Sequence, residues 1–225
     1  RMIISMPPRE GAFAQYVVMR DESLIEVPDH VALDKAALAE PLSVSWHSAR
    51  LGLAALDRAL GENALIIGGG AIGLAAALAL KAQGLDDVTI AEPNEARRAY
   101  LRDACDQRVV SSGAGPYAMV VDAVGYAATR ASASALCAPG GVIVHIGLGE
   151  DTGGLDIRRM TLQEITFIGT YAYTPADFRD TCAAIFDGRL GPLDWTAARP
   201  LTEGADADIR AGSMAAPKTI LHPWS

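Results

Sequence analysis

The chain has 225 residues, of which half are hydrophobic and a fifth are charged. This composition is typical of a folded globular protein and excludes a disordered or fibrous chain. The formal net charge is −8 and the basic residues form no cluster, so we expect neither nucleic acid nor an anionic membrane surface as a partner. No apolar run reaches about 18 residues, and the N-terminus lacks a signal-peptide pattern, so we expect no transmembrane helix and no secretion.

The three cysteines, Cys105, Cys137 and Cys182, lie far apart and form no C-x-x-C pair. This spacing indicates neither a disulfide framework nor a metal-binding knuckle. Cys137 and Cys182 stand among small apolar residues, and we expect both side chains in the core. With no targeting pattern beside it, this cysteine usage predicts a cytoplasmic location.

The N-terminal part of the chain predicts a small β-rich region rather than alternating strands and helices. Residues 12–19 and 24–28 are predicted strands. A helix is predicted to begin within residues 34–40, to be interrupted at Pro41, and to continue over residues 44–56.

A glycine motif follows the first strongly apolar segment. Residues 64–67 predict a buried strand, and Gly68, Gly70 and Gly73 then form G-x-G-x-x-G ahead of a predicted helix over residues 74–82. In such a turn the first glycine allows a tight bend, the second admits a pyrophosphate, and the third lets the helix pack closely on the strand.

The start of this helix is the expected phosphate site. Ala71, Ile72 and Gly73 present N–H groups and a partial positive charge to the pyrophosphate. We therefore include these residues, with Gly68 and Gly70, among the predicted cofactor-binding residues. The alternative is a glycine-rich turn that binds nothing.

Strands and helices alternate after the glycine turn, which predicts an α/β fold with a doubly wound parallel Rossmann sheet in the order 3-2-1-4-5-6. The connection over residues 111–118 is too short for a helix, so one face of the sheet should be thin there. Further strands are predicted over residues 88–91, 108–110, 119–122, 141–146 and 165–169, and helices over residues 94–105, 127–136 and 177–186.

The end of the second predicted strand carries the residue expected to choose the coenzyme. Glu92 lies about 20 residues beyond the glycine turn, where a carboxylate binds the adenosine ribose hydroxyls and repels a 2′-phosphate. Arg97 and Arg98 favour the opposite choice, because an arginine can hold that phosphate. We predict NAD rather than NADP, with Arg97 near the site. The alternative for Glu92 is a solvated carboxylate at a helix start.

The ends of the fourth and fifth strands are the expected place for the nicotinamide. Val124 follows the fourth strand, and Ile146, Gly147 and Leu148 follow the fifth. Ligands in such sheets bind at the carboxyl ends of the strands, so backbone groups here are expected to meet the carboxamide. Their alternative role is turn formation.

Two residues of the predicted helix around Pro41 are candidates for chemistry. Glu40 stands in an apolar setting and is a candidate metal ligand or catalytic residue, with a local cap or ion pair as the alternative. His47 is a weaker catalytic candidate, with packing as the alternative. The other histidines show no ligand spacing, and no Ser–His–Asp arrangement is visible.

The chain resembles the medium-chain dehydrogenase/reductase family, in particular its zinc-dependent alcohol and polyol (sorbitol-like) dehydrogenases. The Glu-Pro-Leu at Glu40 favours the zinc branch over the zinc-free quinone reductases. The stretches that carry the resemblance are Gly11-Ala-Phe-Ala-Gln-Tyr-Val-Val, Ala39-Glu-Pro-Leu-Ser-Val-Ser-Trp-His, residues 68–73, Val121-Asp-Ala-Val-Gly and Ala216-Pro-Lys-Thr-Ile-Leu-His-Pro.

The resemblance implies how the chain is organised. Residues 1–39 and 201–225 are expected to be remnants of a β-rich, GroES-like catalytic domain, and residues 40–200 the dinucleotide-binding domain. Roughly the first hundred residues of the family pattern are missing, and the family's other zinc ligands lie there. We therefore expect a fragment that binds coenzyme but is inactive alone.

The resemblance also implies a function. The intact protein is expected to oxidise a secondary alcohol or polyol, with NAD taking the hydride and zinc, beside Glu40, polarising the substrate oxygen. The alternatives are a zinc-free quinone or enoyl reductase and a dinucleotide-binding module without catalysis. A homodimer or homotetramer is expected, with residues 155–160 and 165–171 forming an apolar, β-prone edge.

Overall fold

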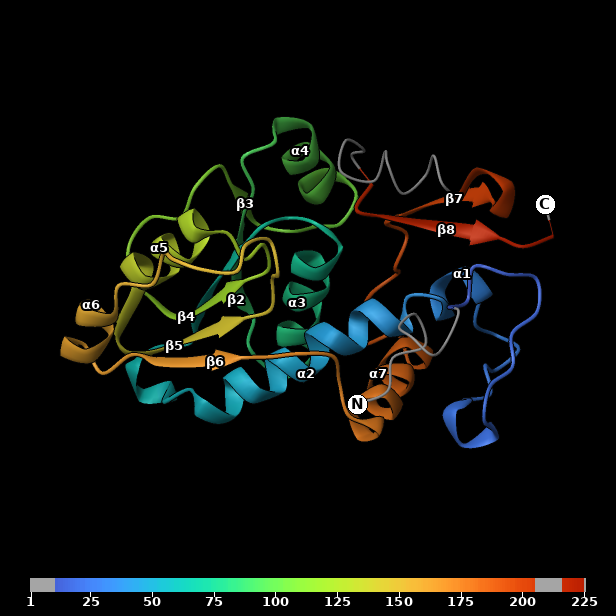
Figure 1. Ribbon diagram of the computed structural model, residues 1–225, viewed down its shortest axis with the longest axis horizontal. Coiled ribbons are helices and arrows are strands. Elements are labelled where there is room, and N and C mark those ends of the chain that lie inside the picture. Colours follow the sequence, from blue (N-terminus) through green and yellow to red (C-terminus); the bar gives the residue numbers. More distant parts are fainter. Residues whose placement is uncertain (1–10, 205–215, 225) are drawn as a thin grey trace.

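The computed structural model describes residues 11–204 and 216–224, and its main element is a six-stranded parallel sheet. The strand order is β3-β2-β1-β4-β5-β6, which confirms the predicted doubly wound topology (Figure 1). The strands are β1 (Asn63–Ile67), β2 (Asp87–Ala91), β3 (Val109–Val110), β4 (Tyr117–Asp122), β5 (Cys137–His145) and β6 (Thr166–Gly169).

The register of the central strands places their carboxyl ends at one edge. Ile67 of β1 pairs with Ala91 of β2 and with Asp122 of β4, and Asp122 in turn pairs with His145 of β5. The turns that follow these strands therefore begin side by side, although they are far apart in the sequence. This edge brings most of the predicted cofactor-binding residues together.

Helices cover both faces of the sheet. One face packs against α2, α3 and α4, with α7 packed on α2, and the other face packs against α5 and α6. Successive residues of β1 alternate between the two cores, as the two-residue period of a strand requires. The helices are α1 (Leu33–Ala36), α2 (Ala39–Ala55), α3 (Ala71–Ala82), α4 (Glu95–Asp103), α5 (Ala127–Leu136), α6 (Ile157–Leu162) and α7 (Pro175–Phe186).

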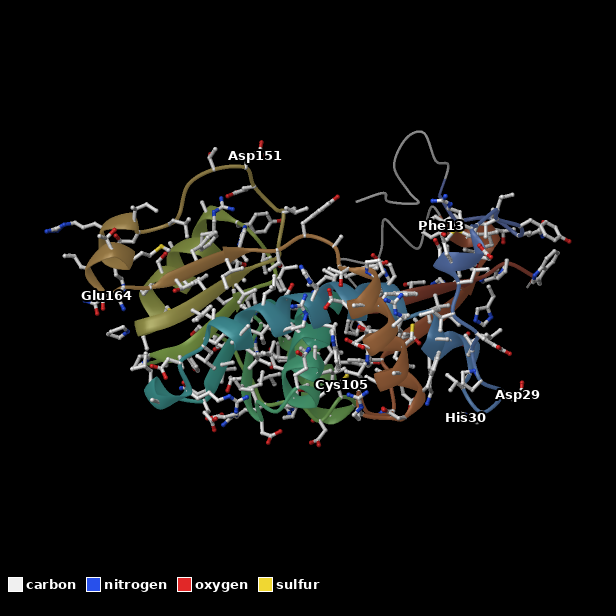
Figure 2. All side chains as sticks on the ribbon, turned by 90° about the horizontal axis from the view of Figure 1, so that it is seen from below. Phe13, Asp29, His30, Cys105, Asp151 and Glu164 are labelled. Atoms are coloured by element: carbon white, nitrogen blue, oxygen red, sulfur yellow. The ribbon has the colours of Figure 1, made fainter. Side chains whose placement is uncertain are left out.

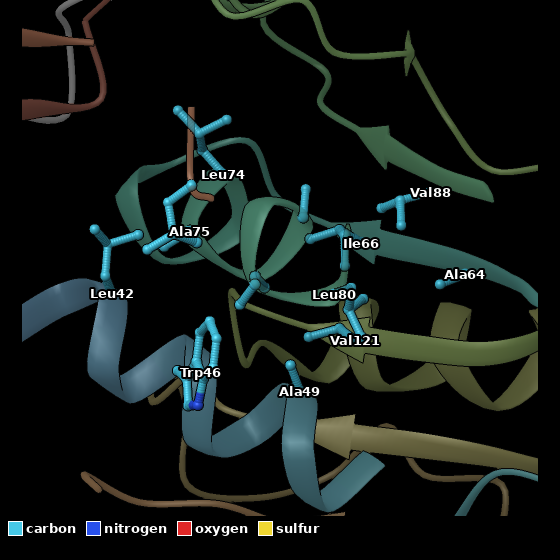
Figure 3. Packing of buried hydrophobic residues seen from close by; sticks show 14 of the residues in the cluster. Leu42, Trp46, Ala49, Ala64, Ile66, Leu74, Ala75, Leu80, Val88 and Val121 are labelled. Carbon is cyan, nitrogen blue, oxygen red and sulfur yellow. The ribbon is translucent and has the colours of Figure 1, made fainter. Parts of the chain in front are cut away.

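Helix α3 packs on the sheet and on α2, which also reaches the sheet at Gly52, and these two contacts explain its composition. Figure 3 shows Trp46 and Ala49 of α2 facing the α3 side, with Ile66 of β1 on the strand side of the same cluster. A helix covered on two sides needs apolar or small residues around most of its surface, and α3 is built almost entirely of Ala and Leu. The glycine turn at its start is thus held by the core on both sides.

The connection between β3 and β4 contains no helix, as predicted from its length. Its backbone lies directly on the sheet at Gly113, where a Cβ would be 2.5 Å from a methyl carbon of Leu65 and 3.0 Å from one of Leu136. Backbone therefore covers the sheet where a helix would usually stand.

Several local predictions were wrong. Residues 12–19 and 24–28 form no strands, since this segment has few regular hydrogen-bonded elements. Pro41 does not interrupt a helix but lies in the first turn of α2, where its missing N–H has no intrahelical partner to lose. The predicted β-prone segment at residues 155–160 instead leads into helix α6, capped by Asp156, whose carboxylate accepts from the Arg159 N–H.

A second, two-stranded sheet stands apart from the first (Figure 1). It pairs β7 (Thr196–Pro200) with β8 (Lys218–His222) in parallel. The strand predicted near the C-terminus is therefore present, but it pairs with β7 and not with the described residues of the N-terminal segment. Contacts to that segment come from side chains, such as the Tyr16 ring against Trp224 at 5.3 Å. The division into two domains remains a prediction.

Cys137 and Cys182 are buried in the two cores, as expected. Within residues 11–204 and 216–224, no helix is both long and apolar enough to cross a membrane.

Candidate coenzyme site

The glycine turn has the geometry that each glycine predicts. Gly68 has a φ of +99°, which a side chain disfavours. A Cβ on Gly73 would lie 1.8 Å from the Gly68 carbonyl oxygen, so the helix can approach the strand only without a side chain here. A Cβ on Gly70 would meet nothing within 4 Å. The space above Gly70 is therefore open, at the N-terminus of α3.

The open space lies against two further predicted residues, Ala71 and Ile72. Gly70 is the N-cap of α3 and forms no side-chain cap, so the first N–H groups of the helix, beginning at Ala71 and Ile72, face this end without a protein side chain. Ala71 and Ile72 are half-buried. An anionic group above Gly70 would meet these N–H groups and the positive end of the helix dipole.

Glu92 is nearly buried and is tied to the glycine turn. Its side chain accepts the Gly69 N–H at 2.9 Å on one oxygen and the Asn94 N–H at 2.8 Å on the other. The residue is only 5 % exposed. This geometry does not support the alternative of a freely solvated carboxylate, because both oxygens are fixed at the end of β2, beside the turn.

The two arginines are placed differently around Glu92. The Arg97 guanidinium lies 3.9 Å from the Glu92 carboxylate. Arg98 donates to the backbone carbonyls of Glu92 at 2.9 Å and Pro93 at 2.6 Å. Arg98 would have to leave both carbonyls to hold a 2′-phosphate, whereas Arg97 already stands beside the predicted ribose position.

The turns after β4 and β5 interlock. Gly125 has a φ of +82°, and a Cβ there would lie 2.2 Å from the Gly147 carbonyl oxygen. A Cβ on Gly147 would in turn lie 2.1 Å from the Val124 carbonyl carbon. Asp122, fully buried, accepts the N–H groups of Val124 at 3.0 Å and Gly125 at 2.9 Å. The two turns thus touch through their backbones and form one wall of the candidate site at the carboxyl edge of the sheet.

The predicted nicotinamide residues lie on this wall. Ile146 is buried and donates its N–H to the Asp122 carbonyl at 2.9 Å, and Gly147 donates to the same carbonyl at 3.1 Å. Leu148 is 78 % exposed, and Tyr126 beside it is also exposed. Val124, Ile146, Gly147 and Leu148 therefore meet at the sheet edge, as their positions after the two strands predict.

Glu40 lies far along the chain from this wall, in the first turn of α2. The residue remains exposed, but its carboxyl loses part of its water. This loss raises the pKa of Glu40, and the nearby Lys218 ammonium offsets only part of the rise. In the part of the chain that the structure describes, no three His, Cys, Asp or Glu side chains come together as a metal site. Catalytic zinc is held by three protein ligands, so the described residues do not fit a zinc ion.

His47 is buried between α2 and α7. Its Nδ1 atom lies 2.8 Å from one carboxylate oxygen of Asp177, and the same oxygen accepts from the Thr174 hydroxyl at 2.6 Å. The other oxygen accepts from Arg50 at 2.7 Å. Burial of Asp177 raises its pKa, but the hydrogen bonds from Arg50, Thr174 and His47 outweigh this and hold the pKa far below its ordinary value. His47 thus takes part in a helix–helix contact, and its catalytic role remains a prediction.

Two further residues support the site: Asp122 lies in the Val121-Asp-Ala-Val-Gly stretch but was not predicted to have a role, and Arg130 has no sequence signal. Both residues hold the turn at Gly125. Asp122 accepts the Gly125 N–H, and Arg130 donates to the Gly125 carbonyl. An aspartate after a strand and an arginine in an Ala/Ser helix are common, and only the folded chain shows that they meet at one turn. The pairing of Gly125 with Gly147 is similarly visible only once the two strands lie side by side.

A parallel sheet in this order, with a glycine turn after the central strand and a fixed carboxylate after the next, defines a dinucleotide-binding domain of the Rossmann type. The chain belongs to the zinc-binding dehydrogenase family, whose family model matches residues 71–187, just over half of the chain. The resemblance to medium-chain alcohol and polyol dehydrogenases is thereby confirmed.

Curated relatives carry names from the same group of enzymes. The chain is 31% identical over 199 residues to a probable diacetyl reductase [(R)-acetoin forming] 2 of Saccharomyces cerevisiae, covering 81% of this chain and 47% of that protein. It is 36% identical over 150 residues to a D-altritol 5-dehydrogenase of Agrobacterium fabrum, covering 61% of this chain and 43% of that protein. The chain spans about half the length of the curated relatives it matches.

Solved structures agree in fold. A short chain alcohol dehydrogenase of E. coli CFT073, complexed with NADH, has a TM-score of 0.82 at 18% identity, covering 96% of this chain and 67% of that one. An acetophenone reductase of Geotrichum candidum, in complex with NAD, also has a TM-score of 0.82, at 22% identity, covering 95% and 63%. At these identities the likeness establishes the fold.

Proposed function

We propose that the chain binds NAD(H) along the carboxyl edge of the six-stranded sheet, with the adenosine half over β1 and β2 and the nicotinamide half over β4 and β5. The observation that carries this proposal is the open space above Gly70, at the start of α3 and beside the fixed carboxylate of Glu92. A pyrophosphate there would accept from the helix N–H groups. When bound, the coenzyme supplies the group that accepts or donates hydride.

The residues of this chain would divide the binding between them. The turn at Gly68 and Gly70 holds the phosphates, and Glu92 accepts from the adenosine ribose hydroxyls. Gly147 and Leu148 offer backbone groups to the nicotinamide carboxamide, and the exposed Leu148 side chain offers apolar cover. The wall after β4 and β5 thereby orients the ring.

For the intact protein we propose oxidation of a secondary alcohol or polyol by hydride transfer to NAD. The names of the relatives, which include diacetyl and D-xylulose reductases, support a small hydroxy or keto substrate. The zinc-assisted step is proposed for the intact protein alone, since the described residues hold one candidate ligand, Glu40. A zinc-free quinone or enoyl reductase and a non-catalytic dinucleotide-binding module are the alternatives. Metal analysis of the intact protein with a panel of alcohols identifies the zinc enzyme, and a panel of quinones and enoyl substrates then separates the two alternatives.

We also propose a homo-oligomer, dimeric or tetrameric, and a cytoplasmic location, with no nucleic acid or membrane partner. The sheet edge at β6 supports the first, because Phe167 and Tyr171 are exposed along it, with Ile157 and Leu162 of the neighbouring α6. The acidic net charge supports the absence of nucleic acid.

Two glycine substitutions test coenzyme binding by this chain. Gly70→Ala places its methyl group in open space and should change the free energy of unfolding by no more than about 1 kcal/mol. It should nevertheless weaken NADH binding strongly, because the methyl group occupies the proposed phosphate position. Gly73→Ala should lower both stability and binding, because its methyl group collides with the Gly68 carbonyl.

Thermal unfolding and NADH fluorescence measure the two effects. The proposal fails if Gly70→Ala binds NADH as well as the unsubstituted chain does.

A further inference from the structure

Arg130 on α5 is a buried cation that holds backbone rather than a carboxylate. It is 6 % exposed, and among the described residues it forms no ion pair. Its guanidinium donates to the Gly153 carbonyl at 2.6 Å, to Gly125 at 2.8 Å and to Glu150 at 3.0 Å, and also to the Thr152 carbonyl. One side chain therefore gathers four carbonyls.

These carbonyls belong to two segments at the sheet edge. Gly125 is in the turn after β4, while the other three lie in the loop over residues 149–154, which follows β5. Figure 2 labels Asp151 in this loop, which stands out from the sheet. Arg130 thus links the turn after β4 to the loop after β5 through one side chain.

Other contacts fasten the same loop to the start of α5. The Glu150 carboxylate accepts the Ala127 N–H at 2.6 Å, and the Glu150 N–H donates to the Gly125 carbonyl at 2.9 Å. A Cβ on Gly154, where φ is +88°, would lie 2.0 Å from the Ala127 carbonyl oxygen. The loop therefore has little freedom while the arginine holds its carbonyls.

Buried side chains of opposite charge hold both backbone polar groups of Gly125, and so fix the peptide units on its two sides. Asp122 accepts its N–H, and Arg130 donates to its carbonyl. Gly125 contacts Gly147 so closely that neither position has room for a Cβ. A shift of the Gly125 turn would consequently move Gly147 and the neighbouring Leu148.

The guanidinium is suited to this task because its five N–H donors form a rigid planar fork. A lysine ammonium carries the same charge on one atom. It cannot bond at once to the Gly125 carbonyl and to the carbonyls of the loop over residues 149–154. The chemistry therefore requires the fork and not merely a positive charge.

We infer that Arg130 is a positioning residue for the nicotinamide half of the coenzyme: it fixes the wall at Gly125, Gly147 and Leu148 by holding the loop over residues 149–154. This inference rests on the proposed binding of NAD(H). It concerns only the half of the coenzyme over β4 and β5, and leaves the adenosine half to the glycine turn and Glu92.

The test compares two ligands on the 225-residue chain. NADH reports on the whole site, and ADP-ribose lacks only the nicotinamide. Arg130→Met should raise the Kd of NADH about tenfold, the size expected for a lost hydrogen-bonded charge, and should leave the Kd of ADP-ribose within about twofold. Arg130→Lys should fail to restore NADH affinity.

Arg159→Met is the matched control. Arg159 also donates to backbone carbonyls, of Ser134 at 2.7 Å and Cys137 at 3.0 Å, but these lie at the opposite end of β5. Arg159→Met should leave the Kd of NADH and the Kd of ADP-ribose unchanged. Hydrogen exchange measured without ligand should rise over residues 147–154 in Arg130→Met and not in Arg159→Met.

Equal loss of NADH and ADP-ribose binding in Arg130→Met would assign this arginine a general structural role and overturn the inference. Full rescue by lysine, or unchanged exchange over residues 147–154, would also overturn it. If the unsubstituted chain binds neither ligand, the proposed function itself is wrong, and the inference falls with it.

Discussion

Glu92 connects the fold and the proposed ligand through one carboxylate. Its two oxygens accept from Gly69 and Asn94, so the same group that should bind the ribose also fixes the glycine turn. A carboxylate accepts about four hydrogen bonds, which leaves capacity for the ribose hydroxyls. Removing the whole side chain would leave both N–H groups without their acceptor, whereas a glutamine keeps the shape and one of the two acceptor oxygens and is the milder perturbation.

Glu92→Gln should therefore weaken NAD binding by about 1–3 kcal/mol, because the ribose hydroxyls lose a charged acceptor. Discrimination against NADP should fall at the same time, since the carboxylate no longer repels the 2′-phosphate. Binding of both coenzymes is measured by fluorescence titration. Glu95→Gln, at an exposed position in the first turn of α4, is the control and should change neither affinity. Equal affinity of the unsubstituted chain for both coenzymes would instead assign the choice to Arg97.

At the scale of elements, Asp177 joins α2 to α7. It closes the capping box of α7 with Thr174 and also accepts from His47 and Arg50 of α2. Because this carboxylate is buried and accepts several hydrogen bonds, its loss should loosen the packing of α7 on α2. The consequence for stability depends on pH, since the pKa of Asp177 is held far below its ordinary value.

Asp177→Asn should lower the free energy of unfolding by about 1–3 kcal/mol at neutral pH. The folded-state pKa is depressed, so this stabilisation is fully present above the ordinary aspartate pKa, near 4, and is lost only as the pH falls below it. The difference between the two proteins should thus be constant above about pH 5 and shrink in stronger acid. Urea unfolding at several pH values measures it.

Asp187→Asn is the matched control, because Asp187 forms its ion pair with Arg189 at the surface. It should have little effect on stability. A pH-independent difference for Asp177→Asn would show that the carboxylate contributes through shape alone.

The elements themselves were largely predictable from the sequence. Runs of apolar residues between helical segments gave the sheet and its order, and the glycine spacing located the central turn. Two local predictions failed for different reasons. Residues 12–19 have strand-like composition, but no strand in the described part of the chain pairs with them. In the segment over 155–160, the helix cap at Asp156 outweighed the β-prone composition. The site was predictable at the strand ends, whereas Arg130 acts through contacts to residues 20 to 23 positions away, which no short sequence window contains.

At the scale of the molecule, apolar side chains gather at both ends. Figure 2 shows Phe13 at one end and Glu164, which follows α6, at the other. Phe13, Tyr16, Val18 and Trp224 are exposed beside the two-stranded sheet. Such a small parallel sheet is normally part of a larger covered one, and the chain spans about half the length of its curated relatives. We expect this end to promote nonspecific association.

The edge at β6 should promote specific association instead. Phe167→Lys places a charge on an exposed edge position and should convert an oligomer to monomer, with little change in the free energy of unfolding of one chain. Light scattering coupled to size exclusion measures the mass. Leu60→Lys, at an exposed position remote from β6 in the sequence, is the control and should leave the mass unchanged. A stable monomer at micromolar concentration before any substitution would contradict the proposed oligomer.

The short strand β3 limits how far such assembly can go. With only Val109 and Val110, it offers the opposite edge of the sheet too few backbone groups to recruit another strand. A sheet that is blunt at one edge and open at the other can join a copy of itself only once, open edge to open edge. Growth by strand addition along the six-stranded sheet therefore stops at a pair, and a two-residue strand protects the sheet against polymerisation into fibres.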